Sequence, residues 1–405
     1  MKTCEVQQME ELVDGSTQKQ DSVDLLGCLK HTIKLTGLDC SAAAAAENGH
    51  GSKILAFLTK ILGISVIIVM LVRAFSYLGE EGLTFSFNWS ESNTFGFLGV
   101  LAFLCSICLF GWTKNAFVPN HLKRLSAVRV LRIEQDSEID EYSGLRKKMF
   151  FWSLPWLVTL MGFSLYNALN EKLLYSGAPV SVYKYSIFPA LSFLAWLITS
   201  TCLAIYNLVQ FSMIREIEHF NKELQKASEE KKLKNLQTIS EFSLRQKELI
   251  KLVQKANDSL SSYAKVAPLF CFFALINGIL NFAFFSEVAV PYKFVLIFLV
   301  ASSIALAILS MMPAAKVQDQ LAVAGKILME SDEIESSAEQ QVYQTYRVMI
   351  DRTQKMDSRI YVVNAFGIDS VNLNIAMFIV PNAGPILLMI RKLMAINGVK
   401  FAVEA

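Results

Sequence analysis

Seven long apolar stretches constrain the fold of this chain more than any other feature. A helix needs about 20 mostly apolar residues to cross the hydrocarbon core of a bilayer. The stretches that meet this requirement run over 54–78, 94–112, 149–169, 187–209, 266–285, 293–315 and 370–390. Charged residues make up only 18% of the chain, whereas a soluble domain carries about a quarter. We therefore expect an all-α membrane protein with seven transmembrane helices.

The distribution of basic residues predicts how these helices are oriented. The connections after the second, fourth and sixth stretches hold 25 Lys and Arg residues. The alternate connections hold two, Lys172 and Lys184. Because Lys and Arg are enriched in cytoplasmic loops, the three basic connections and the N-terminus are expected in the cytoplasm. Asn88 then lies in the first outer connection, where its Asn-Trp-Ser sequence makes it a candidate glycosylation site.

The alternation of polar and apolar sequence divides the chain into segments. Residues 1–52 are polar and are expected to form a disordered cytoplasmic tail. Residues 53–315 hold helices one to six, and apolar residues at helical spacing over about 212–265 predict long helical extensions below the membrane. Residues 316–369 are expected to add a cytoplasmic helical segment. The seventh helix occupies 370–392, and 393–405 form a short outer tail.

Several functional classes are disfavoured by the residues themselves. The chain has no HExxH motif and no Gly-rich phosphate loop after a strand, and the interiors of the seven stretches lack Asp and Glu. The last absence disfavours proton-coupled transport, and a net charge of +2 gives no reason to expect nucleic acid. Cys105 and Cys108 lie inside an apolar stretch, where packing explains them better than a metal site. We expect no catalytic residues, no metal, no cofactor and no enzymatic activity.

The seventh stretch is unusual because it contains amides and prolines. At 100° per residue, five of its residues fall within about 80° of one another on a helix. These are Asn374, Phe378, Asn382, Pro385 and Met389. A strip of this kind suits a helix that lines a narrow aqueous path. In the alternative interpretation the amides bond to neighbouring helices, which would stabilise packing by roughly 0.6 to 2 kcal/mol each.

Other polar and aromatic residues are candidates for a ligand pocket. Asn277 and Asn281 are one turn apart in the fifth stretch, so they share a face. They either line a pocket or bond to a neighbouring helix. Phe163 and Tyr166 lie toward the outer end of the third stretch and either shape that pocket or pack in the core. Arg73, near the end of the first stretch, is expected to extend to the lipid headgroups.

Two regions resemble a known family. They read EFSLRQKELIKLVQKANDSLSSYAKVAPLFCFFAL (241–275) and VYQTYRVMIDRTQKMDSRIYVVNAFGIDSVNLNIAMFIV (342–380). The first resembles the helix that leads into the fifth span of insect gustatory and odorant receptors. The second resembles their cytoplasmic helix, small-residue turn with an Asp, and final span. Insect members often end in Thr-Tyr, five apolar residues and Gln-Phe, whereas this chain has Gly384-Pro385, five apolar residues and Arg391-Lys392. It therefore resembles a divergent gustatory-receptor-like protein of an animal such as a nematode.

This resemblance implies a function for the chain. In that family the last span lines the pore of a tetrameric, ligand-gated, non-selective cation channel, and spans two to six enclose the ligand pocket. The expected partners are the lipid bilayer of the plasma membrane, a small-molecule ligand, and further subunits of a homo- or heterotetramer. Two alternatives stay open: a seven-helix chemoreceptor that signals through a G protein, and a family relative that does not conduct ions.

Overall fold

The computed structural model describes residues 25–41, 52–75, 87–133, 141–169, 187–284, 290–331, 339–355, 359–362, 366–375, 389–390, 392–394 and 396. Within these ranges the regular structure is helical apart from one short antiparallel hairpin, β1 (Tyr361–Val362) and β2 (Phe366–Gly367). The helices are α2 (Leu29–Leu35), α4 (Lys53–Phe75), α5 (Phe87–Lys114), α6 (Phe117–Val130), α7 (Ser143–Leu169), α8 (Phe188–Glu229), the 3-10 helix η3 (Lys232–Lys234), α9 (Leu236–Phe284), α10 (Val290–Met329) and α12 (Gln340–Lys355).

Five of the described helices are long and apolar enough to cross a membrane. These are α4, α5, α8, α9 and α10, which overlap the first, second, fourth, fifth and sixth predicted stretches. The third stretch forms α7, a 27-residue helix with Pro155 in its interior. Helix α7 is not among the five helices. Most of the seventh stretch lies outside the described residues. The prediction of a multi-pass helical membrane protein is thus confirmed. That the chain has seven spans and that its N-terminus lies in the cytoplasm stay predictions.

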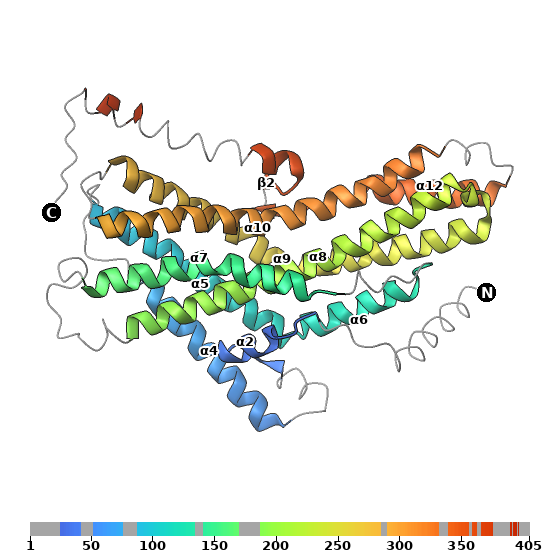
Figure 1. Ribbon diagram of the computed structural model, residues 1–405. Helices are drawn as coiled ribbons and strands as arrows, with labels where there is room; N and C mark the ends of the chain where they lie inside the picture. Colours follow the sequence, from blue (N-terminus) through green and yellow to red (C-terminus); the bar gives the residue numbers. More distant parts are fainter. Residues whose placement is uncertain are drawn as a thin grey trace.

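Three helices are much longer than a bilayer requires. At 1.5 Å per residue, α8 and α9 are about 63 and 74 Å long, against a hydrocarbon core of about 30 Å. The predicted extensions below the membrane are therefore helical, and α10 likewise continues without a break past residue 315. The helices α8, α9 and α10 run side by side, and α12 packs against α9 and α10 at one end of the bundle (Figure 1).

The chain reverses sharply between α8 and α9. Lys231 adopts the left-handed conformation with φ 58°, which ends α8 and leads into η3. The side chain of Asn235 then accepts a hydrogen bond of 2.8 Å from the backbone N–H of Gln237, which is the usual way an N-cap residue starts a helix. This turn places the extensions of α8 and α9 antiparallel, so that their apolar faces can bury each other.

The bundle has two parts with different surroundings. We call α4, α5, α7 and the parts of α8, α9 and α10 in the predicted stretches the membrane half. We call α6, α12 and the remaining extensions of α8, α9 and α10 the helical layer. In the membrane half, α4 exposes large apolar side chains, among them Ile54, Phe57 and Val72, with exposed fractions above 60%. Exposed apolar surface on this scale is expected where a helix faces lipid.

Part of the predicted N-terminal tail is ordered. Helix α2 lies within it, and Leu25, Leu38 and Cys40 on either side of this helix are completely buried. The predicted disorder of residues 1–52 is therefore wrong for residues 25–41, because these few apolar side chains are enough to dock the segment on the bundle. Residues 1–24 lie outside the described part of the chain.

Candidate functional site

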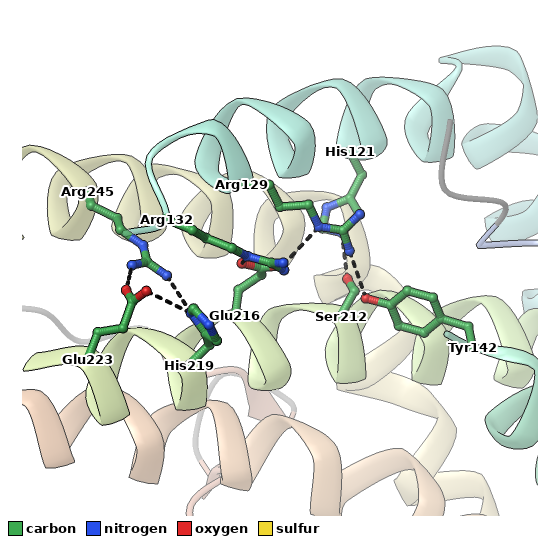
Figure 2. Close-up of polar contacts among 9 residues, drawn as sticks. All are labelled: His121, Arg129, Arg132, Tyr142, Ser212, Glu216, His219, Glu223 and Arg245. Carbon is green, nitrogen blue, oxygen red and sulfur yellow. Dashed lines mark hydrogen bonds and ion pairs between the residues drawn. The ribbon is translucent and has the colours of Figure 1, made fainter. Parts of the chain in front are cut away.

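A buried group of charged side chains joins three helices in the helical layer. We call it the ionic cluster; its members are Arg129, Arg132, Glu216, His219, Glu223 and Arg245 (Figure 2). Glu216, His219 and Glu223 lie three and four residues apart on α8, so they share one face of that helix. Arg129 reaches this face from α6, Arg132 from two residues beyond the end of α6, and Arg245 from α9.

Glu216 is the centre of the larger half of the ionic cluster. Its carboxylate is completely buried and accepts a hydrogen bond of 3.0 Å from Nε of Arg129. Nε of Arg132 donates to the other carboxylate oxygen at 3.1 Å. Nη2 of Arg129 also donates to the hydroxyl of Tyr142, at 3.2 Å, just before α7 begins. One carboxylate therefore holds α6, and through Tyr142 the start of α7, against α8.

The smaller half of the ionic cluster joins α8 to α9. Arg245 forms an ion pair with Glu223, and its Nη2 lies 3.0 Å from Nδ1 of His219. The guanidinium also lies over the ring of Phe220, 5.6 Å from its centroid. Burial lowers the pKa of Arg245 to about 10, so the side chain stays charged at neutral pH. Buried ion pairs of this kind are costly to break, because removing one partner leaves a desolvated charge.

A second histidine fixes the position of α6. Nε2 of His121 lies 2.9 Å from the hydroxyl of Ser212 on α8, in a buried position. Burial, together with the nearby charges of Arg124 and Arg129, lowers the pKa of His121 to about 4. The imidazole is therefore neutral at physiological pH.

The ionic cluster leaves a partial signal in the sequence. The basic residues of the connections serve as topology signals in the sequence, although Arg129, Arg132 and Arg245 are buried. Glu216 and Glu223 lie seven residues apart among the buried apolar residues of α8, and this pattern could have revealed the cluster.

Among the predicted pocket residues, two are buried on α9. Asn277 is 8% exposed and Asn281 is completely buried. Neither amide atom of Asn281 makes a hydrogen bond with a described residue. A Cβ on the adjacent Gly278 would come within 2.9 Å of Val300, so α9 and α10 are in close contact beside the two amides. Phe163 and Tyr166 lie in α7, but their side chains are outside the described part of the structure.

A further polar group lies in the membrane half. Arg73 of α4 is only 3% exposed, and its Nη2 donates to the hydroxyl of Ser192 on α8 at 3.3 Å. Ser192 in turn accepts a hydrogen bond of 2.6 Å from Ser164 on α7. The expectation that Arg73 extends to the headgroups is therefore wrong, since the guanidinium is buried and bonded to Ser192 inside the bundle.

The predicted pore strip is described only at its two ends. Asn374 is exposed in the helical turn over 370–375, and Met389 is 65% exposed. Phe378, Asn382 and Pro385 lie outside the described residues.

The helical turn over 370–375, at the start of the seventh predicted stretch, is held by side-chain contacts. The carboxylate of Asp369 accepts a hydrogen bond of 2.8 Å from the backbone N–H of Asn372, as an N-cap does, and Ser370 donates to Asp319 on α10 at 3.1 Å. Asp369 also lies 3.4 Å from Arg359. The entry to the seventh stretch is thus tied both to α10 and to the β1–β2 segment.

The predicted glycosylation site lies in a helix. Asn88 lies in the first turn of α5, whereas the sequence places it in a connecting loop, and its side chain is outside the described structure. Among the described residues no group of three or more His, Cys, Asp or Glu side chains could hold a metal ion.

Comparison with known proteins extends this picture. The family described as "Caenorhabditis protein of unknown function, DUF267" matches residues 25–384. No curated protein matches the sequence. The fold is similar to that of the insect olfactory receptor OR5 from Machilis hrabei, with a TM-score of 0.61 at 11% identity, over 91% of this chain and 100% of that one. The same receptor in complex with eugenol gives a TM-score of 0.59 at 12% identity, with the same coverage.

Proposed function

The chain belongs to the Caenorhabditis family DUF267, and from its fold we propose that it is a chemosensory receptor of the gustatory-receptor-like type in the plasma membrane. In this proposal it is a ligand-gated, non-selective cation channel of four subunits whose last helix lines the pore. The observation that carries the proposal is the similarity of fold to an olfactory receptor along the full length of that receptor.

The buried amides of α9 support a ligand-binding role for the membrane half. A buried amide without a hydrogen-bond partner costs about 1–3 kcal/mol of stability. Asn281 is therefore expected to destabilise the fold when no ligand is bound. A small molecule with a donor or acceptor would satisfy this amide. We propose that Asn277, Asn281, Phe163 and Tyr166 contribute to the ligand pocket.

The contacts around Asp369 support a route from that pocket to the pore. Helix α10 packs against α9 beside the two amides, and its other end holds Ser370 through Asp319. A ligand that shifts α10 relative to α9 would therefore act on the first residues of the last helix. We propose that Asn374, Phe378, Asn382, Pro385 and Met389 line the pore.

The experiment has two stages. An N-terminal epitope tag is first probed in intact and then in permeabilised cells, and staining only after permeabilisation is expected. Whole-cell currents are then recorded from tagged cells and from empty cells during application of an odorant panel that includes eugenol. A tag that is accessible on intact cells would contradict the channel and favour signalling through a G protein.

Two variants separate pore from pocket. Asn382→Leu is expected to change the relative permeability to Na⁺ and K⁺, because an amide that stabilises hydrated cations is lost. Asn281→Leu is expected to shift the concentration dependence of activation. Surface expression of both variants is measured by biotinylation, and a failure of Asn382→Leu to assemble would assign that amide to helix packing.

A further inference from the structure

A basic groove separates α6 from α9 in the helical layer, on a part of the molecule that the proposed channel mechanism does not use. Its volume is about 220 Å³, somewhat below the range of about 300–1,000 Å³ of drug-sized pockets. The floor is apolar and includes Val128 and Leu252, which are 2% and 1% exposed. The rim is charged and includes Arg124, Glu248, Lys251 and Lys255.

Only one of the three cations on the rim has an ion-pair partner among the described residues. Nζ of Lys251 lies 2.6 Å from the carboxylate of Glu248, one turn away on α9. Within the described part of the chain, Arg124 and Lys255 form no ion pair. The two opposite walls therefore each present an unpaired cation to the same small volume. An anion between them would gain charge-assisted hydrogen bonds from both helices.

The rim contains a hydrogen-bond acceptor beside the cations. The carboxylate of Glu248 would repel a ligand whose negative charge lies next to it, but it can accept hydrogen bonds from hydroxyl groups. A ligand that carries both phosphates and hydroxyls fits this pattern, with its phosphates at Arg124 and Lys255 and its hydroxyls toward Glu248. Phosphorylated polyols such as inositol phosphates have this chemistry.

The position of the groove brings it near the membrane. Lys255 lies 11 residues before the start of the stretch at 266, which is about 16 Å along α9. The other wall, α6, begins three residues after α5 ends. Basic pockets at the cytoplasmic ends of transmembrane helices are a recognised setting for phosphoinositide headgroups.

We propose that the groove between α6 and α9 binds a phosphorylated polyol, either as the headgroup of a phosphoinositide or as a free inositol phosphate. Bound there, the ligand links α6 to α9, whereas Glu216 in the ionic cluster holds α6 to α8. Helix α6 would then be bound to both α8 and α9, so the ligand would stiffen the helical layer.

The test measures binding of a fluorescent short-chain phosphatidylinositol bisphosphate to the purified full-length chain in detergent. The variant R124Q/K255Q is expected to weaken binding on the order of tenfold or more, because one charge-assisted contact is lost on each wall. The matched control K222Q/K326Q removes the same charge from exposed positions on α8 and α10 and is expected to leave binding within about twofold. The charge-conserving variant R124K/K255R is expected to retain binding.

The source of the ligand is resolved by competition. Displacement of the probe by inositol trisphosphate supports a headgroup site that a soluble molecule can also fill. Displacement only by the unlabelled short-chain lipid supports a lipid site. Equal binding by wild type and R124Q/K255Q, or equal weakening in the control, would overturn the proposal. Thermal unfolding of each variant shows that the fold is intact, and because no current is recorded, the result is independent of channel activity.

Discussion

The membrane half and the helical layer bury polar groups in opposite ways. In the helical layer the buried groups include full charges, and Glu216 meets both Arg129 and Arg132. In the membrane half the corresponding groups are mostly neutral amides and hydroxyls, and Arg73 is bonded to Ser192. A charge can be buried in the layer because a partner of opposite sign can be supplied there. In lipid the cost of desolvating a charge is higher, so neutral groups dominate.

This difference has a functional consequence. The layer is held by strong, specific pairs that join α6, α8 and α9, whereas the amide of Asn281 in the membrane half has no hydrogen-bond partner among the described residues. The layer is therefore expected to be the rigid part of the molecule and the membrane half the responsive part. The predictions below test that division, from the largest expected effect to the smallest.

Glu216→Gln should cause the largest loss of stability. The substitution keeps the shape of the side chain but removes the buried negative charge that Arg129 and Arg132 share, which is expected to cost about 3–5 kcal/mol. The midpoint of thermal unfolding of the purified protein measures the effect. Glu241→Gln on the exposed face of α9 is the control and should change stability by less than about 0.5 kcal/mol. Comparable midpoints for the two variants would show that the layer does not depend on its ion pairs.

Acid should destabilise the helical layer through His121. The pKa of this imidazole is about 4 in the folded protein and about 6.5 in the unfolded chain. Below pH 6.5 the unfolded chain therefore takes up a proton that the folded protein does not, and the free energy of unfolding falls until the pH reaches about 4. The expected loss is on the order of 3 kcal/mol.

The unfolding midpoint, followed between pH 8 and pH 4, should fall less steeply for His121→Gln than for the wild type. Gln keeps a polar partner for Ser212 but cannot take up a proton in this range. If the unfolding midpoints of the two proteins fell equally with pH, the protonation of His121 would not be the cause of the acid sensitivity.

Asn281→Leu should raise the free energy of unfolding, whereas Glu216→Gln lowers it. Replacing an unpartnered buried amide by an apolar group of similar volume is expected to gain about 1–3 kcal/mol. Asn221→Leu in the helical layer is a matched comparison, because the amide of Asn221 donates to the carbonyl of Gln320 at 2.8 Å and its loss should destabilise. If both variants lost stability, Asn281 would have a structural partner and the contrast between the two halves would weaken.

Lys355→Ala should have the smallest effect. Lys355 pairs with Asp351 at 3.5 Å on α12, but both side chains are more than half exposed. Exposed pairs one turn apart contribute about 0.3–0.5 kcal/mol, and salt reduces this further. Unfolding midpoints at low and high salt check this expectation. A loss close to that of Glu216→Gln would mean that burial does not distinguish the ion pairs.

The sequence was sufficient to determine that the chain is a multi-pass helical membrane protein. The apolar stretches have the length that a bilayer imposes, and helices satisfy their own backbone hydrogen bonds there. The extensions of α8 and α9 could also be predicted, since apolar residues recur at helical spacing over 212–265. Two short regions were enough to predict a resemblance to insect chemoreceptors, and the fold is similar to that of a solved insect olfactory receptor.

Only the tertiary structure decided which polar residues are buried and with whom. Nothing in the local sequence distinguishes Arg129, which pairs with Glu216 across 87 positions of the chain, from the exposed Arg124 on the same helix. Arg73 likewise has its partner Ser192 on another helix, and residues 25–41 dock on surfaces formed far along the chain. The hydrophobic pattern is a local property, whereas the pairing of buried charges depends on which helices meet and in which register.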